Sequence, residues 1–325
     1  MNVAVLDDYQ RVALSYPYWS TLPPAVKVVP FHEHIASFDE LAERLEPFEV
    51  VVAMRERTPL PGELLARLPR LRLIVTTGMA NASIDLAAAR ERGVTVCGTG
   101  ASGSSTVELT WALILAVVRG IPSADATLRS GEWQAGSTPG GDLDGATLGV
   151  LGLGRLGSRV AGIGRAFGMR VVAWSQNLTA ERAAEHGAEL VTLPELLSTS
   201  DVLTVHLRLS DRTHGLLGAP ELALLKPSAY LVNTSRGPIV DQAALIEAVS
   251  ARRFAGVGLD VYDLEPLPPG HPLLTLPNTV LTPHLGYVSE RTFDVFYRDI
   301  VEDVAAFHAG DPIRVISPGG RAGAG

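Results

Sequence analysis

The amino-acid sequence predicts an α/β protein with two doubly wound domains, each built on a parallel β-sheet. Short β-branched runs alternate along the chain with amphipathic stretches of helical period, and the connection between two parallel strands requires such a crossover. One long apolar helix, predicted at 104–120 (SSTVELTWALILAVVRG), interrupts this alternation, and a second alternating series follows it. The chain length of 325 residues agrees with two domains of roughly 100–200 residues each.

The first series has amphipathic stretches between its strands, such as SFDELAERL (37–45). Its predicted strands are VAVL (3–6), VKVV (26–29), VVVAM (50–54), LRLIVTT (71–77) and VTVC (94–97). Gly93 ends another amphipathic stretch, where a glycine is a typical helix stop.

The second series has strands that are almost continuously apolar, as expected of strands covered on both faces. They are TLGVLG (147–152), RVVAW (170–174), DVLTVHL (201–207), AYLVNT (229–234), GVGLDVY (256–262) and TVLTP (279–283). The helix predicted at 289–310 has no strand after it in this series, so we expect it to return to the first domain. One domain is therefore expected from 1–99 plus 288–325, with a second domain, 100–287, inserted into it.

Composition and charge exclude several classes of protein. The net charge of −8 argues against a general nucleic-acid binder, which needs a basic face. The single cysteine, Cys97, forms neither an intrachain disulfide nor a cysteine metal cluster. The first residues lack the basic and apolar regions of a signal peptide, and no run of about 18 apolar residues predicts a membrane helix. We therefore expect a cytoplasmic protein with neither nucleic acid nor membrane as a partner.

A glycine-rich turn, GLGRLG (152–157), follows a predicted strand and opens a predicted helix. In such a turn the first glycine permits the bend, the second lets the backbone approach a pyrophosphate, and the third lets helix pack on strand. The N-terminus of the helix also favours phosphate. An isolated GxGxxG is a weak signal, but this context predicts a dinucleotide site. Its predicted members are Gly152, Gly154, Arg155, Leu156 and Gly157.

The choice between NAD and NADP depends on the end of the next strand. An acidic residue there would bind the ribose 2′-hydroxyl and repel a 2′-phosphate. This chain instead has Ser175, Gln176 and Asn177, which are neutral hydrogen-bonding residues. The sequence thus predicts NAD or NADP and leaves the preference open.

Arg236, Glu265 and His284 each follow one of the last three predicted strands. Ligands of an open parallel sheet bind beyond the carboxyl ends of its strands, and all three residues fall on that side, with Gly152. Spacing alone does not distinguish such residues from ordinary solvated loop residues.

At these positions the chain resembles the D-isomer-specific 2-hydroxyacid dehydrogenases, which include phosphoglycerate dehydrogenases and glyoxylate/hydroxypyruvate reductases. Three long segments carry the resemblance: 142–171, around the glycine turn; 225–249, with LVNTSRGPIVD; and 255–287, with GLDVYDLEP and LTPHLGY. The resemblance implies a Rossmann cofactor domain inserted into a flavodoxin-like substrate domain. It also implies hydride transfer between NAD(P)H and a 2-oxo acid, giving a D-2-hydroxy acid, in a cleft between the domains.

The resemblance implies a role for each of the three loop residues. Arg236 would hold the substrate carboxylate and carbonyl oxygen, because its planar fork suits bidentate contact. His284 would be the general acid and base, and Glu265 would orient the imidazole and favour its protonated form. Further cofactor contacts implied by the resemblance are His206, Thr234, Ser235, Asp260 and Gly286.

The first domain matches the family in its substrate loop, TTGMANASID (76–85). The implied substrate contacts are Arg55, Gly78 and Met79. Ala80 and Asn81 occupy positions where the family has a second glycine and often an aromatic residue, so the substrate is not named. In MRERTPL (54–60), Arg55 and Glu56 are interpreted either as substrate contacts or as a surface charge pair. Hinges are expected near Thr99 and at 283–286.

The resemblance further implies a homodimer, formed through 104–120 and the segment ATLRSGEWQAG (126–136). No metal is expected, because His32 and His34 have no third ligand at useful spacing, and we interpret them as part of a solvated loop. Three alternatives stay open: a formate or phosphite dehydrogenase, an NADH-sensing scaffold like the C-terminal-binding-protein corepressors, and an unrelated Rossmann enzyme such as a methyltransferase. Glu265 argues against a formate dehydrogenase, in which glutamine pairs with the histidine.

Overall fold

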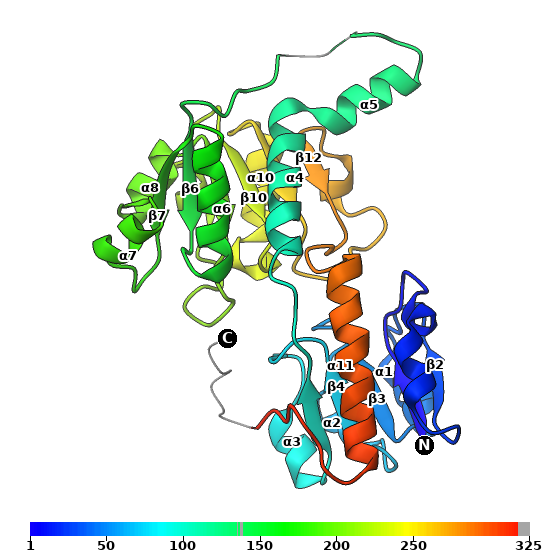
Figure 1. Ribbon diagram of the computed structural model, residues 1–325. Coiled ribbons are helices and arrows are strands. Elements are labelled where there is room, and N and C mark those ends of the chain that lie inside the picture. Colours follow the sequence, from blue (N-terminus) through cyan, green and yellow to red (C-terminus); the bar gives the residue numbers. More distant parts are fainter. Residues whose placement is uncertain (135, 137–138, 318–325) are drawn as a thin grey trace. The chain divides into compact units, whose positions relative to one another are not determined.

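The computed structural model describes residues 1–134, 136 and 139–317 of the chain (Figure 1). The chain divides into two compact units, the first made of Met1–Ser102 and the chain from Ser289 onward, the second of Gly103–Val288. Thr99 and Gly100 remain within the first unit, because Thr99 N donates to Thr76 O at 3.2 Å and Gly100 N donates to Asp299 Oδ2 at 2.8 Å.

The first unit contains a five-stranded parallel sheet in the order β2-β1-β3-β4-β5. Its strands are β1 (Asn2–Val5), β2 (Lys27–Pro30), β3 (Val50–Ala53), β4 (Leu73–Thr76) and β5 (Thr95–Gly98). Its helices are α1 (Phe38–Leu45), α2 (Gly62–Ala66), α3 (Leu86–Glu91) and α11 (Glu290–His308), with the 3-10 turns η1 (Ala13–Ser15) and η2 (Pro17–Thr21). Register follows from pairs such as Val3 with Val28 and with Val50. Ser37, Asp85 and Ser289 cap α1, α3 and α11 by accepting bonds from amides of the first turn.

Both faces of this sheet are buried at β1, β3, β4 and β5, whereas the edge strand β2 is partly exposed. Side chains such as Ala4, Val51 and Ile74 pack with apolar residues of α1, α2 and α3 in one cluster. Because side chains alternate along a strand, the intervening residues lie on the opposite face, and α11 packs against β4 and β5. The α11 side chains Phe296 and Tyr297 are fully buried.

The second unit contains a seven-stranded parallel sheet in the order β12-β11-β10-β9-β6-β7-β8. Its strands are β6 (Thr147–Leu151), β7 (Arg170–Trp174), β8 (Glu189–Leu190), β9 (Val202–Val205), β10 (Tyr230–Asn233), β11 (Gly256–Leu259) and β12 (Thr279–Leu281). Its helices are α4 (Ser105–Arg119), α5 (Ile121–Arg129), α6 (Arg155–Ala166), α7 (Ala180–Glu185), α8 (Leu193–Thr199), α9 (Ala219–Leu222) and α10 (Gln242–Ser250), with η3 (Gly237–Ile239) and η4 (Pro272–Thr275). Separate apolar clusters cover its two faces, one with α4 and α6 and one with α8 and α10.

The fold class expected from the sequence is confirmed, with two differences in its elements. The short edge strand β8 and helix α5 were not predicted, and α5 is separated from α4 by Gly120 at φ +60°. Several strands end earlier than the sequence predicts. Gly152, His206 and Thr234 were included in predicted strands, but they lie after the last residues of β6, β9 and β10. In the described part of the chain no single helix is long and apolar enough to cross a membrane. Helices α4 and α5 reach the length and hydropathy of a membrane span only when taken together, and they are bent by 64° relative to each other.

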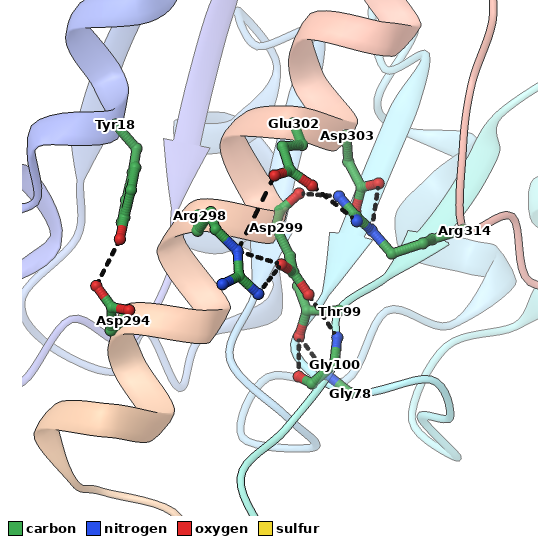
Figure 2. A network of polar contacts seen from close by, with 10 residues as sticks. All are labelled: Tyr18, Gly78, Thr99, Gly100, Asp294, Arg298, Asp299, Glu302, Asp303 and Arg314. Atoms are coloured by element: carbon green, nitrogen blue, oxygen red, sulfur yellow. Dashed lines mark hydrogen bonds and ion pairs between the residues drawn. The ribbon is translucent and has the colours of Figure 1, made fainter. Parts of the chain in front are cut away.

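A polar network lies on α11 in the first unit (Figure 2). Arg314 donates from Nε to Asp303 Oδ1 at 3.0 Å, from Nη1 to Glu302 Oε2 at 2.9 Å and from Nη2 to Asp299 O at 2.7 Å. Arg298 donates to Asp299 Oδ1, whose other oxygen accepts from Gly100 N. The network therefore ties α11 to the end of the first segment of this unit.

Asp303 gives this network a pH-dependent contribution to stability. Its side chain is fully buried, and burial raises its pKa from 3.8 to about 7, although Arg314 opposes the shift. A raised pKa in the folded state stabilises the protein below the unfolded pKa, and the stabilisation is lost as the pH rises through the folded pKa. The free energy of unfolding of the wild type should thus fall by on the order of a few kcal/mol between about pH 4 and pH 7 through this residue. Asp303→Asn should not show this decrease.

Denaturant titrations of both proteins between pH 4 and pH 8 measure this contribution as the difference in their free energies of unfolding. Groups common to both proteins cancel in that difference. A difference that is constant over the pH range would show that Asp303 is ionised throughout.

Candidate active site

The turn between β6 and α6 has the backbone geometry of a phosphate cradle. Gly152 has φ +104°, and a Cβ on it would lie 2.8 Å from the backbone of His206. A Cβ on Gly157 would lie 2.0 Å from Gly152 O, whereas a Cβ on Gly154 would meet no atom within 4 Å. The outer two glycines are thus required for close packing of the turn, while Gly154 faces open space.

The N-terminus of α6 fits an anion. Gly154 is its N-cap and has no side chain to bond the free amides of the first turn. Arg155 is exposed at the first helical position, and Leu156 is partly buried behind it. Free amides, the positive end of the helix dipole and an exposed guanidinium fit the pyrophosphate of a dinucleotide.

The end of β7 lies beside this turn, because Gly152 N donates to Trp174 O at 2.8 Å. Ser175 is partly buried, and Gln176 and Asn177 form an exposed turn after it. A dinucleotide ribose there would meet hydroxyl and amide groups of these three residues, which agrees with the open choice between NAD and NADP.

The strand order reverses at β6, which places a ligand crevice at the carboxyl ends of β6 and β9. His206 follows β9 there, and its backbone N donates to Leu151 O at 2.8 Å. Burial lowers the pKa of His206 to about 4, so its imidazole is neutral at neutral pH. Its Nε2 lies 2.9 Å from Thr204 Oγ1. These features suit a hydrogen-bonding wall of the crevice rather than an acid catalyst.

Arg236 lies in the loop after β10, and hydrogen bonds fix the conformation of this loop. Asn233 Nδ2 donates to Arg236 O at 2.9 Å, and Asn233 Oδ1 accepts from Ser235 N at 3.0 Å. Arg236 Nη1 donates to Ser235 O at 2.7 Å. Ser235 Oγ donates to Leu207 O, and Thr234 Oγ1 lies 2.8 Å from Thr110 Oγ1. Asn233 is a positioning residue that the sequence reasoning missed, because as the last residue of a strand it had no motif of its own.

His284 and Glu265 form the shortest-range charged contact of the site. Glu265 Oε2 lies 2.5 Å from His284 Nδ1, and their side chains are 26% and 16% exposed. Glu265 Oε1 accepts from Tyr262 N at 2.9 Å, which holds the carboxylate in place. The Tyr287 ring packs edge-on against the imidazole. Because Nδ1 is engaged, Nε2 is the ring nitrogen that can exchange a proton with a ligand.

Asp260 holds the loop that carries His284. It is 0% exposed and accepts from Thr282 Oγ1 at 2.7 Å, from Leu285 N at 2.6 Å and from Gly286 N at 2.8 Å. Burial raises its pKa above the ordinary value, although these donors oppose the shift. These bonds clamp a loop in which His284 has φ +54°, so Asp260 has a positioning role that the sequence did not indicate.

Arg236, Glu265 and His284 follow three strands that are neighbours in the sheet, β10, β11 and β12. The strands are parallel, so the three loops lie at one edge of the sheet, the edge that also carries the glycine turn after β6. A pocket of about 380 Å³, lined by residues such as Asp144 and Tyr230, lies at the opposite edge and is not part of this site.

The residues that the resemblance implies as substrate contacts lie in the first unit. Arg55 has φ +55°, and its Nη1 donates to Thr77 O at 3.2 Å. The guanidinium covers Gly78, where an added Cβ would lie 2.1 Å from Nη1. Asn81 Nδ2 donates to Arg55 O at 2.6 Å, which fixes this loop. Met79 is 42% exposed beside Gly78.

His32 and His34 lie in a partly exposed loop after β2, as expected, but their rings also have carboxylate partners that the sequence did not predict. Their Nδ1 atoms each lie 3.2 Å from a carboxylate, that of Asp8 and that of Asp7, both of which are buried. These contacts form because β2 runs beside β1 and brings the two histidines to the carboxyl end of β1. Within the described residues no group of three or more His, Cys, Asp and Glu side chains is arranged to hold a metal ion.

The fold and the site together define a dinucleotide-dependent oxidoreductase. Residues 111–286 match the profile described as "D-isomer specific 2-hydroxyacid dehydrogenase, NAD binding domain". The chain is 43% identical over 256 residues to a glyoxylate reductase of Aeropyrum pernix, which is 76% of each chain. It is 36% identical over 315 residues to a D-3-phosphoglycerate dehydrogenase of Archaeoglobus fulgidus, covering 97% of this chain but 58% of that longer protein.

Its fold also matches the crystal structure of a phosphoglycerate oxidoreductase from Vibrio cholerae with a TM-score of 0.92, at 38% identity over 95% of this chain and 99% of the other. The chain belongs to the D-isomer-specific 2-hydroxyacid dehydrogenase family. It is accordingly an oxidoreductase that transfers a hydride between NAD or NADP and a 2-hydroxy acid, and the relatives do not favour the corepressor-like alternative.

Proposed function

We propose that this protein reduces a 2-oxo acid to a D-2-hydroxy acid with Arg236, Glu265 and His284 as its catalytic residues. The observation that carries the proposal is the contact of 2.5 Å between His284 Nδ1 and Glu265 Oε2. It lies at the same sheet edge as Arg236 and the glycine turn.

Each of these residues has a different role in the reaction. Arg236 binds the carboxylate and the carbonyl oxygen through its planar fork. His284 donates a proton from Nε2 to the carbonyl oxygen, and in the opposite direction it accepts that proton from the hydroxyl group. Glu265 fixes the orientation of the ring and stabilises the imidazolium. The bound nicotinamide supplies the hydride in reduction and accepts it in oxidation.

The cofactor and substrate contacts complete the proposal. The cofactor contacts are Gly152, Gly154, Arg155, Leu156, Gly157, Ser175, Gln176, Asn177, His206, Thr234, Ser235, Asp260 and Gly286. Asp260 and Gly286 act mainly through the loop that they fix, because Asp260 is fully buried among its own donors. Arg55, Gly78 and Met79 contact the substrate, which is supported by the exposure of Met79 and the fixed Arg55 loop.

A panel of glyoxylate, hydroxypyruvate, pyruvate and phenylpyruvate, each with NADH and with NADPH, tests this function. Oxidation of the cofactor with at least one of these acids supports it. A protein that binds NADH and a partner peptide but turns over none of the acids would instead be a scaffold, and the proposal would fail.

Ser175→Asp is expected to raise the preference for NADH over NADPH by about tenfold or more, because a carboxylate at the end of β7 binds the ribose 2′-hydroxyl and repels a 2′-phosphate. The measurement is the ratio of kcat/KM for the two cofactors at one substrate concentration series. Ser198→Asp, on the exposed surface of α8, is the control and should leave the ratio unchanged. An unchanged ratio in Ser175→Asp would mean that Ser175 does not face the ribose.

We also propose that the protein is a cytoplasmic homodimer. The α5 residues Ile121 and Leu128 are 54% and 55% exposed, and Trp133 beyond the helix is 79% exposed. Most apolar side chains of α4 are buried against its own sheet, so α5 offers the larger free apolar surface. Residues 135, 137 and 138, in and just after the expected contact segment, lie outside the described residues. Sedimentation velocity measures the mass in solution, and a monomer at micromolar concentration would contradict the proposal.

A further inference from the structure

The chain that leaves β9 borders the dinucleotide crevice on the side opposite β7. Leu151, the last residue of β6, is the register partner of both Trp174 of β7 and Val205 of β9. A Cβ on Gly152 would lie 3.0 Å from Leu207 N, so the chain after β9 touches the glycine turn directly. The residues that follow β7 and those that follow β9 therefore lie level with each other, on the two sides of this turn.

The register also sets the width of the crevice. Adjacent strands are about 4.8 Å apart, so the chains that leave β7 and β9 are separated by about 10 Å. Ser175 is the first residue after β7, and the proposed cofactor contacts place the adenosine ribose against it. Arg208 is the third residue after β9. A phosphate on the 2′-oxygen of that ribose would occupy the space between these two residues, within reach of a long arginine side chain.

Hydrogen bonds fix the backbone at Arg208 but not its side chain. Thr213 Oγ1 donates to Arg208 O at 2.6 Å and accepts from Ser210 N at 2.8 Å, which closes a short loop. Ser235 Oγ donates to Leu207 O, which ties the preceding residue to the loop after β10. Arg208 is exposed, and within the described residues its guanidinium has neither a hydrogen bond nor an ion pair. A cation on a fixed backbone is thus available to a ligand.

The residues directly after β7 carry no charge that would oppose a phosphate. Ser175, Gln176 and Asn177 are neutral, whereas an acid there would bind the ribose 2′-hydroxyl and repel a 2′-phosphate. Asp211 is the nearest acid to Arg208 along the chain, and it is exposed, so solvent screens its charge. The 2′-phosphate adds about −1.5 to −2 charges at neutral pH. It can therefore form a charged hydrogen bond with a guanidinium that the hydroxyl of NAD cannot form.

We propose that Arg208 binds the adenosine 2′-phosphate and that the protein therefore uses NADPH in preference to NADH. Arg155, exposed in the first turn of α6, serves the pyrophosphate that both cofactors share, whereas Arg208 binds the group that only NADPH has. The inference rests on the proposed cofactor contacts at the end of β7. It is independent of the catalytic roles proposed for Arg236, Glu265 and His284.

Titration of the protein with NADH and with NADPH, followed by nicotinamide fluorescence without substrate, gives the dissociation constant of each cofactor. The wild type should bind NADPH more tightly. Arg208→Gln should lower this preference by about tenfold or more, through the constant for NADPH alone, because a charged hydrogen bond is lost. Arg208→Lys keeps the charge and should keep most of the preference. The matched control is Arg253→Gln, which removes an exposed arginine just before β11, at the opposite edge of the sheet, and should leave both constants unchanged.

Three results would overturn the inference. They are a wild type that binds NADH more tightly, an unchanged ratio of the two constants in Arg208→Gln, and an equal weakening of both cofactors, which would place Arg208 at the adenine or the pyrophosphate. A loss of preference of the same size in Arg253→Gln would also overturn it, because net charge at long range would then explain the effect. Circular dichroism checks the fold of each variant, and Arg208→Met, which also lacks the charge, should give the same shift as Arg208→Gln.

Turnover of 2-oxo acids separates this inference from the proposed function. A protein with the expected dissociation constants that turns over none of the acids leaves the role of Arg208 standing and overturns the proposed function. Turnover together with an unchanged ratio in Arg208→Gln does the reverse. A protein that binds neither cofactor contradicts both.

Discussion

His284→Ala is expected to lower kcat by about 10²–10⁴-fold while NADH binding is retained, because a positioned general acid contributes about that factor. Without the imidazole, the carbonyl oxygen must take its proton from water as the hydride arrives. The substituted residue follows β12, away from the glycine turn after β6, so the cofactor contacts of that turn are not altered. Single-turnover kinetics together with a fluorescence titration of NADH measure the two effects separately.

The matched control is His186→Ala, which removes an exposed histidine at the end of α7 and should have kcat near that of the wild type. If His284→Ala loses NADH binding in parallel with turnover, the residue supports the structure of the loop and is not the acid. If kcat is retained, another group supplies the proton.

Arg236→Lys is expected to lower kcat/KM by about a hundredfold or more, because lysine cannot make the bidentate contact and each lost charged hydrogen bond costs about 1.5–3 kcal/mol. The loss should appear in both KM and kcat, because the guanidinium holds the carboxylate in the ground state and the carbonyl oxygen during reduction. Steady-state kinetics with a 2-oxo acid whose side chain is uncharged measure this loss.

The control is Arg253→Lys, at an exposed position after α10. Its kcat/KM should equal that of the wild type. The folding of the Arg236 loop is checked independently, since the bond from Arg236 Nη1 to Ser235 O is lost as well. A variant with wild-type kcat/KM would exclude Arg236 from substrate binding.

The sequence predicted the order of the strands along the chain but not their order in the sheet. Strand periodicity and the glycine turn identify an α/β fold, and they place Arg236, Glu265 and His284 after strands. That β10, β11 and β12 are neighbours, which brings these residues to one edge, depends on long-range packing. Only the resemblance to a family allowed the three residues to be grouped before the structure.

The positioning residues could not be found from the sequence for a different reason. Asn233 bonds to the backbone of the loop that follows its own strand, and Asp260 bonds to the backbone of the loop that follows the neighbouring strand β12. An isolated Asp or Asn has many other uses, so neither role shows in the sequence. The partners of His32 and His34 were not predicted, because Asp8 and Asp7 lie in the loop after the adjacent strand β1. Side-chain partners across strands are not encoded in any local pattern.

The division of the chain at 102 and 289 has an evolutionary consequence. The proposed proton donor, its carboxylate partner and the phosphate turn all belong to one uninterrupted stretch of the gene, while the proposed substrate contacts Arg55, Gly78 and Met79 belong to the flanking stretch. If the proposed contacts hold, mutation or recombination in the flanks would alter which acid is consumed, while the inherited machinery for moving hydrogen would be passed on intact.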